Sequence, residues 1–209
     1  MLLEVKNISY RYNKNSPWIL ENVSFTIDSK ERVALVGPSG YGKSTLSKII
    51  SGYIKPEKGE ILWDGKPIPE KGYCPIQMIY QHPEKSVNPR WKMSKILNEA
   101  FKIDDNILSE MGIEKSWLSR WPSELSGGEL QRFCIARVLS PETKFLVCDE
   151  ISTMLDVITQ AQIWNFLLKI SKKNEFGMLV VTHNMELAKR VCDRVIELPK
   201  LNKVEEVAV

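Results

Sequence analysis

Apolar residues recur along this chain with two different spacings, one typical of strands and one typical of helices. Residues 3–10 and 23–27 alternate apolar and polar positions, as half-buried β-strands do. Short apolar runs indicate further strands, and apolar positions three and four residues apart indicate helices. These further strands are predicted at 32–36, 60–63, 75–80, 145–148, 178–181 and 194–198. Helices are predicted at 46–51, 94–101, 106–111, 157–172 and 185–192, and from 126 to about 140.

The stretch from about residue 82 to 137 differs from the rest of the chain. It holds helical patterns and little that resembles a strand, whereas strands and helices alternate after it. Such alternation indicates an α/β fold with a parallel sheet. We therefore expect one domain over residues 1–209, with a helical subdomain inserted at about 82–137.

The composition is that of a globular protein, with 43% hydrophobic and 26% charged residues. The formal charge of +3 is small and the Lys and Arg residues are spread along the chain, so we expect no nucleic-acid partner. Neither a signal peptide nor an apolar stretch approaching 18 residues is present, so no membrane span is predicted. The 4 cysteines form no C-x-x-C pair, which favours a reduced, cytosolic setting.

Residues 37–45 have the sequence GPSGYGKST, which fits the phosphate-binding pattern G-x-x-x-x-G-K-[ST]. A predicted strand precedes this P-loop and a predicted helix follows it, as the motif requires. Backbone N–H groups of the loop and the positive end of the helix would face phosphate oxygens. Lys43 would reach the β- and γ-phosphates, and the Ser44 hydroxyl would bind Mg²⁺. The residues predicted to hold a nucleoside triphosphate here are Gly37, Ser39, Gly40, Gly42, Lys43, Ser44 and Thr45.

Two acidic residues, Asp149 and Glu150, end the apolar run 145–148. Side chains at the carboxyl end of a buried parallel strand lie where ligands bind. Asp149 would hold Mg²⁺, directly or through water, and Glu150 would reach a water that attacks the γ-phosphate. The alternative is an acidic helix cap or a pair of acidic loop residues, which the P-loop in the same chain disfavours.

The segment 124–132, with the sequence ELSGGELQR, predicts the start of a helix. Ser126 can cap the first turn, and Gly127 and Gly128 allow a close approach to the backbone. Such a helix start is also an anion site, because its first N–H groups have no partner within the helix. Taken alone, the segment fits a capped structural helix at least as well.

Together these motifs resemble those of ATP-binding cassette (ABC) ATPases. Residues 125–132 match the family signature L-S-G-G-E/Q-x-Q-R, and Asp149 matches its Walker B aspartate. The remaining family elements occur in order over residues 3–198. They are the aromatic residue that stacks on adenine (Tyr12), the Q-loop glutamine (Gln81), the D-loop (153–156) and the switch histidine (His183).

The resemblance implies an α/β P-loop NTPase with a RecA-like core, an N-terminal antiparallel β subdomain and the inserted helical subdomain. It also implies ATP and Mg²⁺ as substrate and cofactor. The residues implied in hydrolysis are Glu150, His183 and Gln81, and those implied to hold Mg²⁺ are Ser44, Gln81 and Asp149. Besides the P-loop, the residues implied to bind ATP are Tyr12, Ser126, Gly127 and Gly128.

Three of these residues have structural alternatives. Tyr12 lies with Tyr10 on one face of the predicted strand, so either could be strand packing. Gln81 could be an ordinary polar strand end. His183 is one of 2 histidines, and its place after strand 178–181 favours a role in sensing the γ-phosphate over a structural one.

A narrower resemblance covers residues 80–90, YQHPEKSVNPR, which are similar to a stretch of dipeptide, oligopeptide and nickel importer ATPases. The chain departs from the family pattern at Tyr41 of the P-loop, at Ile151 after Glu150 and at Met154 of the D-loop. The departure at Met154 puts the contact with a second ATPase in doubt. Residues 199–209 contain no cysteine, so the resemblance does not extend to the cysteine-rich C-terminal segment of many peptide importers.

The resemblance implies the ATPase subunit of a membrane transporter, peripheral at the cytoplasmic face of the membrane, which imports peptides or nickel and metal chelates. Its implied partners are a second ATPase subunit in a heterodimer, transmembrane permease subunits and an extracytoplasmic solute-binding protein. A soluble ABC ATPase without a transport role, a regulatory partner with weak hydrolysis and a small-molecule kinase are the alternatives. Lys43, Asp149, Glu150 and His183 argue against the regulatory partner, and the signature argues against the kinase.

Overall fold

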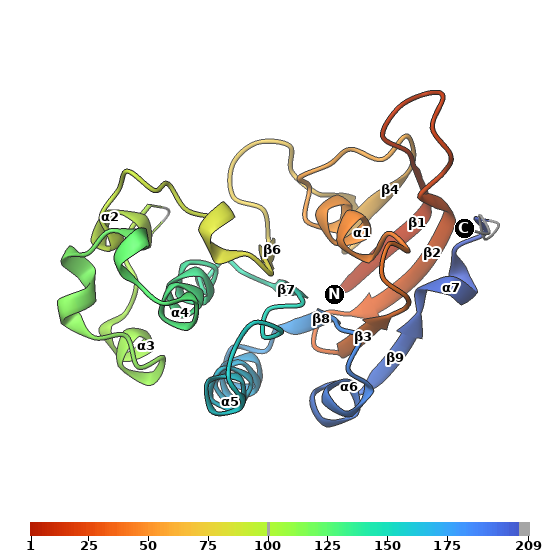
Figure 1. Cartoon of the computed structure of the whole chain (residues 1–209). Coiled ribbons are helices and arrows are strands. Elements are labelled where there is room, and N and C mark those ends of the chain that lie inside the picture. Colours follow the sequence, from red (N-terminus) through yellow and green to blue (C-terminus); the bar gives the residue numbers. More distant parts are fainter. Residues whose placement is uncertain (100, 205–209) are drawn as a thin grey trace.

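The computed structural model describes residues 1–99 and 101–204 (Figure 1). The strands are β1 (Leu2–Tyr10), β2 (Leu20–Asp28), β3 (Arg32–Val36), β4 (Lys58–Trp63), β5 (Lys66–Pro67), β6 (Ile76–Ile79), β7 (Phe145–Asp149), β8 (Gly177–Val181) and β9 (Arg194–Glu197). The α-helices are α1 (Lys43–Ile50), α2 (Met93–Leu97), α3 (Asp105–Glu110), α4 (Gly127–Arg137), α5 (Val157–Asn174), α6 (Met185–Val191) and α7 (Leu198–Leu201). Short 3₁₀ turns lie at Pro83–Lys85, Lys115–Ser119 and Pro122–Glu124.

The strands form two sheets that differ in pairing. A 4-stranded sheet has the order β2-β1-β4-β5 and is antiparallel. A 5-stranded sheet has the order β6-β7-β8-β3-β9, and all its neighbouring strands are parallel. Because parallel strands end at the same edge, the loops after β6, β7, β8 and β3 leave this sheet next to one another.

Helix α1 lies between the two sheets (Figure 1). Its Leu46, Ile49 and Ile50 are buried in one apolar core with residues of β1, β2, β3 and β7. The helix is therefore held from both sides, and the P-loop that precedes it has a fixed support.

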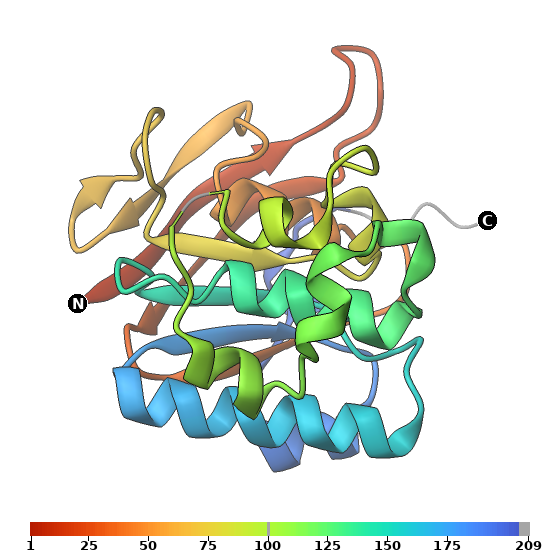
Figure 2. The ribbon, with the colours of Figure 1, turned by 90° about the vertical axis from the view of Figure 1, so that its left-hand side faces the viewer.

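Helices α4 and α5 cover the other face of the parallel sheet, along which α5 runs in Figure 2. The side chains of β7 alternate between the two cores, with Phe145 and Val147 toward α1 and Leu146 and Cys148 toward α4 and α5. All four are completely buried. A strand buried on both faces reads as a continuous apolar run, which is why this one was predictable.

Between β6 and β7 the described residues form α2, α3, α4 and the 3₁₀ turns. Met93 and Ile96 of α2 and Phe133 of α4 belong to the same core as α5. The predicted helical subdomain at about 82–137 lies in this part of the chain, and its extent as a separate unit remains a prediction.

Two predicted helices are too long. The pattern predicts a helix over 94–101, but α2 ends at Leu97, and residue 100 lies outside the described residues. The Asn98 side chain donates a hydrogen bond to the Ser94 carbonyl, 2.8 Å away, and so satisfies a carbonyl at the helix end. The helix predicted to reach about residue 140 ends at Arg137.

Gly59 and Gly65 give a matched test of packing in the antiparallel sheet. Both have positive φ angles, +85° and +73°. A Cβ at Gly59 would overlap the backbone carbonyls of Lys6 and Asn7, whereas a Cβ at Gly65 meets nothing within 4 Å. We expect Gly59→Ala to lower the free energy of unfolding by about 2 kcal/mol more than Gly65→Ala, because only the first adds a backbone clash to the φ strain. Urea denaturation measures both, and equal losses would contradict the packing around Gly59.

Candidate functional site

The P-loop connects β3 to α1 and turns through left-handed backbone at two glycines. Gly40 has a φ of +83° and Gly42 a φ of +88°, a region that L side chains rarely adopt. Residues 38–40 at its tip are exposed. Thr45, in the first turn of α1, is buried. The predicted residues Gly37–Thr45 therefore lie in one loop and one helix start, as the motif requires.

Lys43 is the first residue of α1 and is only 7% exposed. Its ammonium donates hydrogen bonds to the carbonyls of Gly37 and Pro38, each 2.8 Å away. Hydrogen bonds from a cation to a charged phosphate are stronger than those to a neutral carbonyl. The ammonium is thus held against the loop at the place where a phosphate group would compete for it.

Asp149 lies at the end of β7, beside the start of α1. The Ser44 hydroxyl donates a hydrogen bond to Asp149 Oδ1 over 3.1 Å, and Asp149 is only 5% exposed. Burial raises the pKa of the Asp149 carboxyl above its ordinary value of 3.8. The hydrogen bond from Ser44 opposes this shift, and the nearby charge of Glu150 adds to it.

The oxygen donors predicted for Mg²⁺ fit that ion, and the structure brings those of Ser44 and Asp149 together. Ser44, Asp149 and Gln81 carry hydroxyl, carboxylate and amide oxygens, which are the hard ligands that Mg²⁺ prefers. Among residues 1–99 and 101–204, no group of three or more His, Cys, Asp or Glu side chains forms a metal site by itself. Mg²⁺ usually takes one or two carboxylates together with water and substrate phosphates. The donor set therefore suits Mg²⁺ that arrives with a nucleotide.

Glu150 lies between Gln81 and His183. Gln81 Nε2 is 3.3 Å from Glu150 Oε2, and His183 Nδ1 is 3.5 Å from Glu150 Oε1. The parallel ladder brings them together, since β7 lies between β6, which precedes Gln81, and β8, which precedes His183. Glu150 has a φ of +49°, an uncommon conformation that concentrates at functional sites. All three predicted hydrolysis residues thus meet at one edge of the sheet.

Sequence reasoning missed the part that Thr153 plays beside these residues. Its hydroxyl lies 3.3 Å from Gln81 Nε2 and donates a hydrogen bond to the Glu150 carbonyl, 3.0 Å away. Thr153 therefore ties the start of the D-loop to the Q-loop. Its position three residues after Glu150 was the available signal, because a Thr there can bond back to the carbonyl of a turn.

The alternation predicts Tyr12 on the same strand face as Tyr10, but Tyr12 lies outside the strand. β1 ends at Tyr10, and Tyr12 follows it in a bend and is 63% exposed. Its ring stands edge-on to that of Tyr10, with centroids 5.5 Å apart, and its hydroxyl is 3.5 Å from Thr45 Oγ1. An exposed ring at the start of α1 suits stacking on a base. The role of Tyr12 with adenine stays a prediction.

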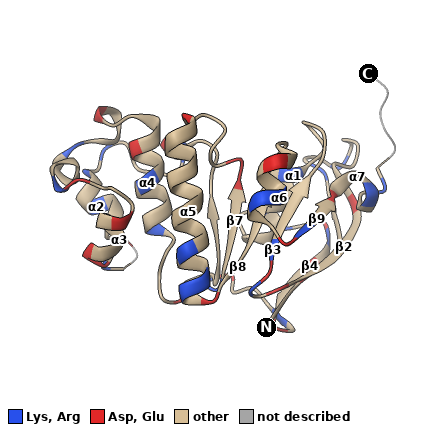
Figure 3. Ribbon diagram, turned by 90° about the horizontal axis from the view of Figure 1, so that it is seen from below, with Lys and Arg blue, Asp and Glu red and all other residues tan. Residues whose placement is uncertain are grey.

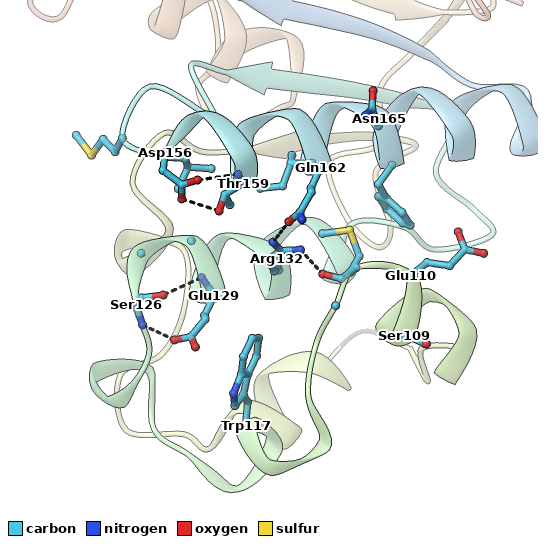
Figure 4. A pocket seen from close by; sticks show the side chains of 18 of the residues that line it. Ser109, Glu110, Trp117, Ser126, Glu129, Arg132, Asp156, Thr159, Gln162 and Asn165 are labelled. Atoms are coloured by element: carbon cyan, nitrogen blue, oxygen red, sulfur yellow. Dashed lines mark hydrogen bonds between the residues drawn. The ribbon is translucent and has the colours of Figure 1, made fainter.

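The signature residues form the exposed start of α4 (Figure 4). Ser126 accepts a hydrogen bond from the Glu129 N–H at 3.2 Å, and the Glu129 carboxylate accepts one from the Ser126 N–H at 2.7 Å. Nothing lies within 4 Å of a Cβ built on Gly127. A groove of about 960 Å³ adjoins this helix start and the D-loop, where Met154 is exposed.

The structure does not bring the signature to the P-loop of the same chain. Figure 3 shows β7 and β8 between α4 on one side and α1 on the other. The site residues therefore fall into two groups, one around Lys43, Asp149 and Glu150 and one around Ser126.

The raised pKa of Asp149 predicts that its negative charge weakens the fold. When a carboxyl has a higher pKa in the folded state than in the unfolded state, the free energy of unfolding falls as pH rises from the unfolded pKa through the folded pKa. The destabilisation is therefore fully present at pH 7. We expect Asp149→Asn to raise the thermal midpoint by a few degrees at pH 7. The gain should shrink toward pH 4, while Mg²⁺-dependent nucleotide binding should weaken.

Asp193→Asn is the matched control for this substitution. Asp193 pairs with Arg32 at 2.6 Å, and the hydrogen bond from Arg32 lowers its pKa. Its removal should lower the thermal midpoint at pH 7. Thermal scans of both variants across pH decide the sign, and a lower midpoint for Asp149→Asn at pH 7 would contradict the cost of the buried charge.

In the described part of the chain, no helix combines the length and apolar character needed to cross a membrane.

Comparisons with known proteins agree with these features. Residues 20–153 match the sequence profile of a family described as ABC transporter. The chain is 34% identical to a Nickel import ATP-binding protein NikE of Shigella dysenteriae, over 100% of this chain and 87% of that protein. It is 36% identical to a Nickel import system ATP-binding protein NikE of Staphylococcus aureus, over 94% of this chain and 86% of that protein.

Solved structures share the fold. CbiO1 from Clostridium perfringens, part of the ABC transporter complex cbiONQ, superposes with a TM-score of 0.76 at 27% identity, over 93% of this chain and 83% of that one. The ATP-binding cassette MJ0796, a dimer bound to ADP and Pi, gives 0.78 at 25% identity, over 93% of each chain. The expected α/β P-loop NTPase fold is therefore confirmed. With the profile match and relatives above 30% identity, the chain belongs to the ABC transporter family, as one of its ATP-hydrolysing domains.

Proposed function

We propose that this chain hydrolyses ATP with Mg²⁺ to power a membrane importer of nickel. The observation that carries the hydrolysis is the meeting of Lys43, Asp149 and Glu150 at one sheet edge, with Gln81 and His183 around Glu150. The cargo rests on relatives named as nickel import proteins and on the sequence of residues 80–90. Peptides are the second candidate cargo, because residues 80–90 also resemble the peptide importers.

In the proposed reaction, Lys43 and the P-loop N–H groups hold the phosphates, and Ser44 and Asp149 supply oxygens for Mg²⁺. Mg²⁺ would neutralise developing negative charge on the phosphates. Glu150 accepts a proton from the attacking water, and its half-buried carboxylate is held by Gln81. His183 lies on the other side of Glu150 and would contact the γ-phosphate.

The signature would act on ATP bound by a second ATPase subunit. Gly127 and Gly128 start α4, an 11-residue helix, and Gly127 is exposed while Gly128 is half-buried. The free amides and the helix dipole attract an anion. Since the P-loop of the same chain lies elsewhere, the phosphate would come from a partner, as in a head-to-tail dimer. We propose a heterodimer, because nickel and peptide importers of this class usually pair two different ATPase chains.

The permease subunits would dock beside Gln81 and the helices that follow it. A groove of about 290 Å³ lies there, lined among others by Tyr53, Tyr80, Lys85 and Arg137. Arg137 is already paired with Glu99 at 2.7 Å, so the aromatic rings and Lys85 are the groups that suit a short helix carrying apolar and acidic residues. This chain would then lie on the cytoplasmic face of the membrane, with a solute-binding protein on the other side.

Nickel accumulation tests the proposed cargo and role. Cells that produce this chain with the permease, second ATPase and solute-binding protein genes of its own chromosomal neighbourhood should accumulate radioactive nickel, and the chain should copurify with the permease. Lys43→Ala should abolish the uptake while the complex still assembles. Uptake of a dipeptide in place of nickel would exclude nickel as the cargo, and failure to copurify with any permease would favour an ATPase without a transport role.

Glu150→Gln should separate ATP binding from hydrolysis. The amide cannot accept the proton of water, so we expect turnover to fall on the order of a hundredfold while the affinity for ATP stays. Phosphate release and nucleotide titration, measured with the partner subunit, give the two values. Glu142→Gln, at an exposed position away from the sheet edge, is the control. Normal turnover of Glu150→Gln would remove Glu150 from the reaction.

Gly127→Arg should block ATP-driven dimerisation and leave ATP binding by the single chain unchanged. The new side chain meets no atom of its own chain within 4 Å of Cβ, and the cap made by Ser126 and Glu129 is kept. Its bulk would fill the place of the partner's phosphate. Ser123→Arg, exposed on the preceding 3₁₀ turn, is the control. Light scattering with ATP measures assembly, and dimers of the Gly127 variant at the parent's level would overturn the shared site.

A further inference from the structure

The segment after β9 packs against the first glycine of the P-loop. A Cβ built on Gly37 would lie 3.0 Å from Pro199 Cδ and 3.8 Å from Leu198 Cβ. Both residues belong to α7, and Leu198 is completely buried. The start of α7 therefore limits how far the P-loop can move on this side.

The start of β2 packs against the last glycine of the same loop. A Cβ on Gly42 would lie 2.9 Å from Ile19 Cγ2, 3.0 Å from Leu20 Cδ2 and 3.2 Å from the Ile19 carbonyl oxygen. The P-loop is thus enclosed between α7, which follows the parallel sheet, and β2 of the antiparallel sheet.

Asn202 joins these two supports. Its Nδ2 donates a hydrogen bond to the Ile19 carbonyl, 2.9 Å away, and its Oδ1 accepts one from the Glu21 N–H over 2.8 Å. The side chain is only 7% exposed, and the Asn202 N–H donates to the Leu198 carbonyl at 2.8 Å. One amide therefore holds the Ile19 carbonyl, whose oxygen would lie 3.2 Å from a Cβ on Gly42, and connects it to α7, which lies beside Gly37.

Ile19 also links this contact to the segment that carries Tyr12. The Ile19 N–H donates to the Tyr10 carbonyl at 2.9 Å, and the Tyr10 ring packs against that of Tyr12. A shift of Ile19 would therefore be transmitted to the phosphate loop directly and to the aromatic residue through Tyr10.

We infer that Asn202 is a positioning residue for phosphate binding, which clamps the P-loop between β2 and α7. The inference rests on the ATP binding proposed for the P-loop. A loop held in its binding geometry does not have to be ordered when phosphate arrives, so a clamp of this kind raises affinity. Asn202 itself acts through the loop backbone and touches neither nucleotide nor reacting atoms.

Asn202→Ala is the first test, on the purified full-length chain. We expect the dissociation constants for ATP and for tripolyphosphate to rise about tenfold, if the loss of one buried hydrogen-bonding group is transmitted to the loop. Turnover at saturating ATP, measured with the partner subunit, should change much less. Lys200→Ala, on the exposed side of α7, is the matched control and should bind like the parent.

Asn202→Asp adds a second test, whose expected result would not arise if Asn202 were only structural. The carboxylate can accept from Glu21 but cannot donate to the Ile19 carbonyl, whereas the protonated acid can do both. Because position 202 is buried, the pKa of the new carboxyl would lie above its ordinary value, so the affinity of this variant, relative to the parent at the same pH, should recover as pH falls from 8 through 5 toward 4. Asn202→Ala should keep its deficit at each pH.

The outcomes are distinguishable. A folded Asn202→Ala chain with the parent's affinities, or one that loses only thermal stability, overturns the clamp. A loss confined to ATP, with normal tripolyphosphate binding, would place the effect at Tyr12 and also overturn it. A parent chain that binds neither ligand would contradict the proposed function itself.

Discussion

The parallel hydrogen-bond ladder of β6, β7, β8 and β3 is the constraint on which the site depends. In that ladder Cys148 pairs with Ile79 and Val180, and Leu35 pairs with Val181. Side chains alternate along a strand, so a slip of one residue would turn the Asp149 carboxylate away from Ser44. The register thus decides which chemical groups face one another at the edge.

The adjacent acids Asp149 and Glu150 point to different parts of the site. Consecutive residues of a regular strand point to opposite faces. Here β7 ends at Asp149, and the positive φ of Glu150 turns the chain out of the strand direction. Asp149 then faces Ser44, while Glu150 faces Gln81 and His183. The unfavourable conformation is tolerated because the cores on both sides of β7 fix the strand before it.

The parts of the fold that could be predicted are those that short-range chemistry determines. The apolar run of β7 indicates a buried strand, and the glycines of the P-loop indicate a phosphate-binding turn, from their own residues alone. The end of α2 was missed, because the spacing of apolar residues does not show that the Asn98 side chain will bond to the Ser94 carbonyl and end the helix there. Asn202 lies outside every motif, and its partners Ile19 and Glu21 are far away in sequence, so only the folded chain reveals its contacts.

The separation of the signature from the P-loop gives the proposed reaction its dependence on a partner. Each chain would hold phosphates at Lys43 but would need amides from another chain to enclose them. The D-loop lies between the two groups, with Thr153 hydrogen-bonded beside Gln81 and Leu155 against Gly128. Met154, Val157 and Ile158 are exposed at the same turn, and burying such apolar side chains would favour association. A subunit that closes on this turn would press on the residues that hold Glu150, so assembly and hydrolysis would be coupled through a few contacts.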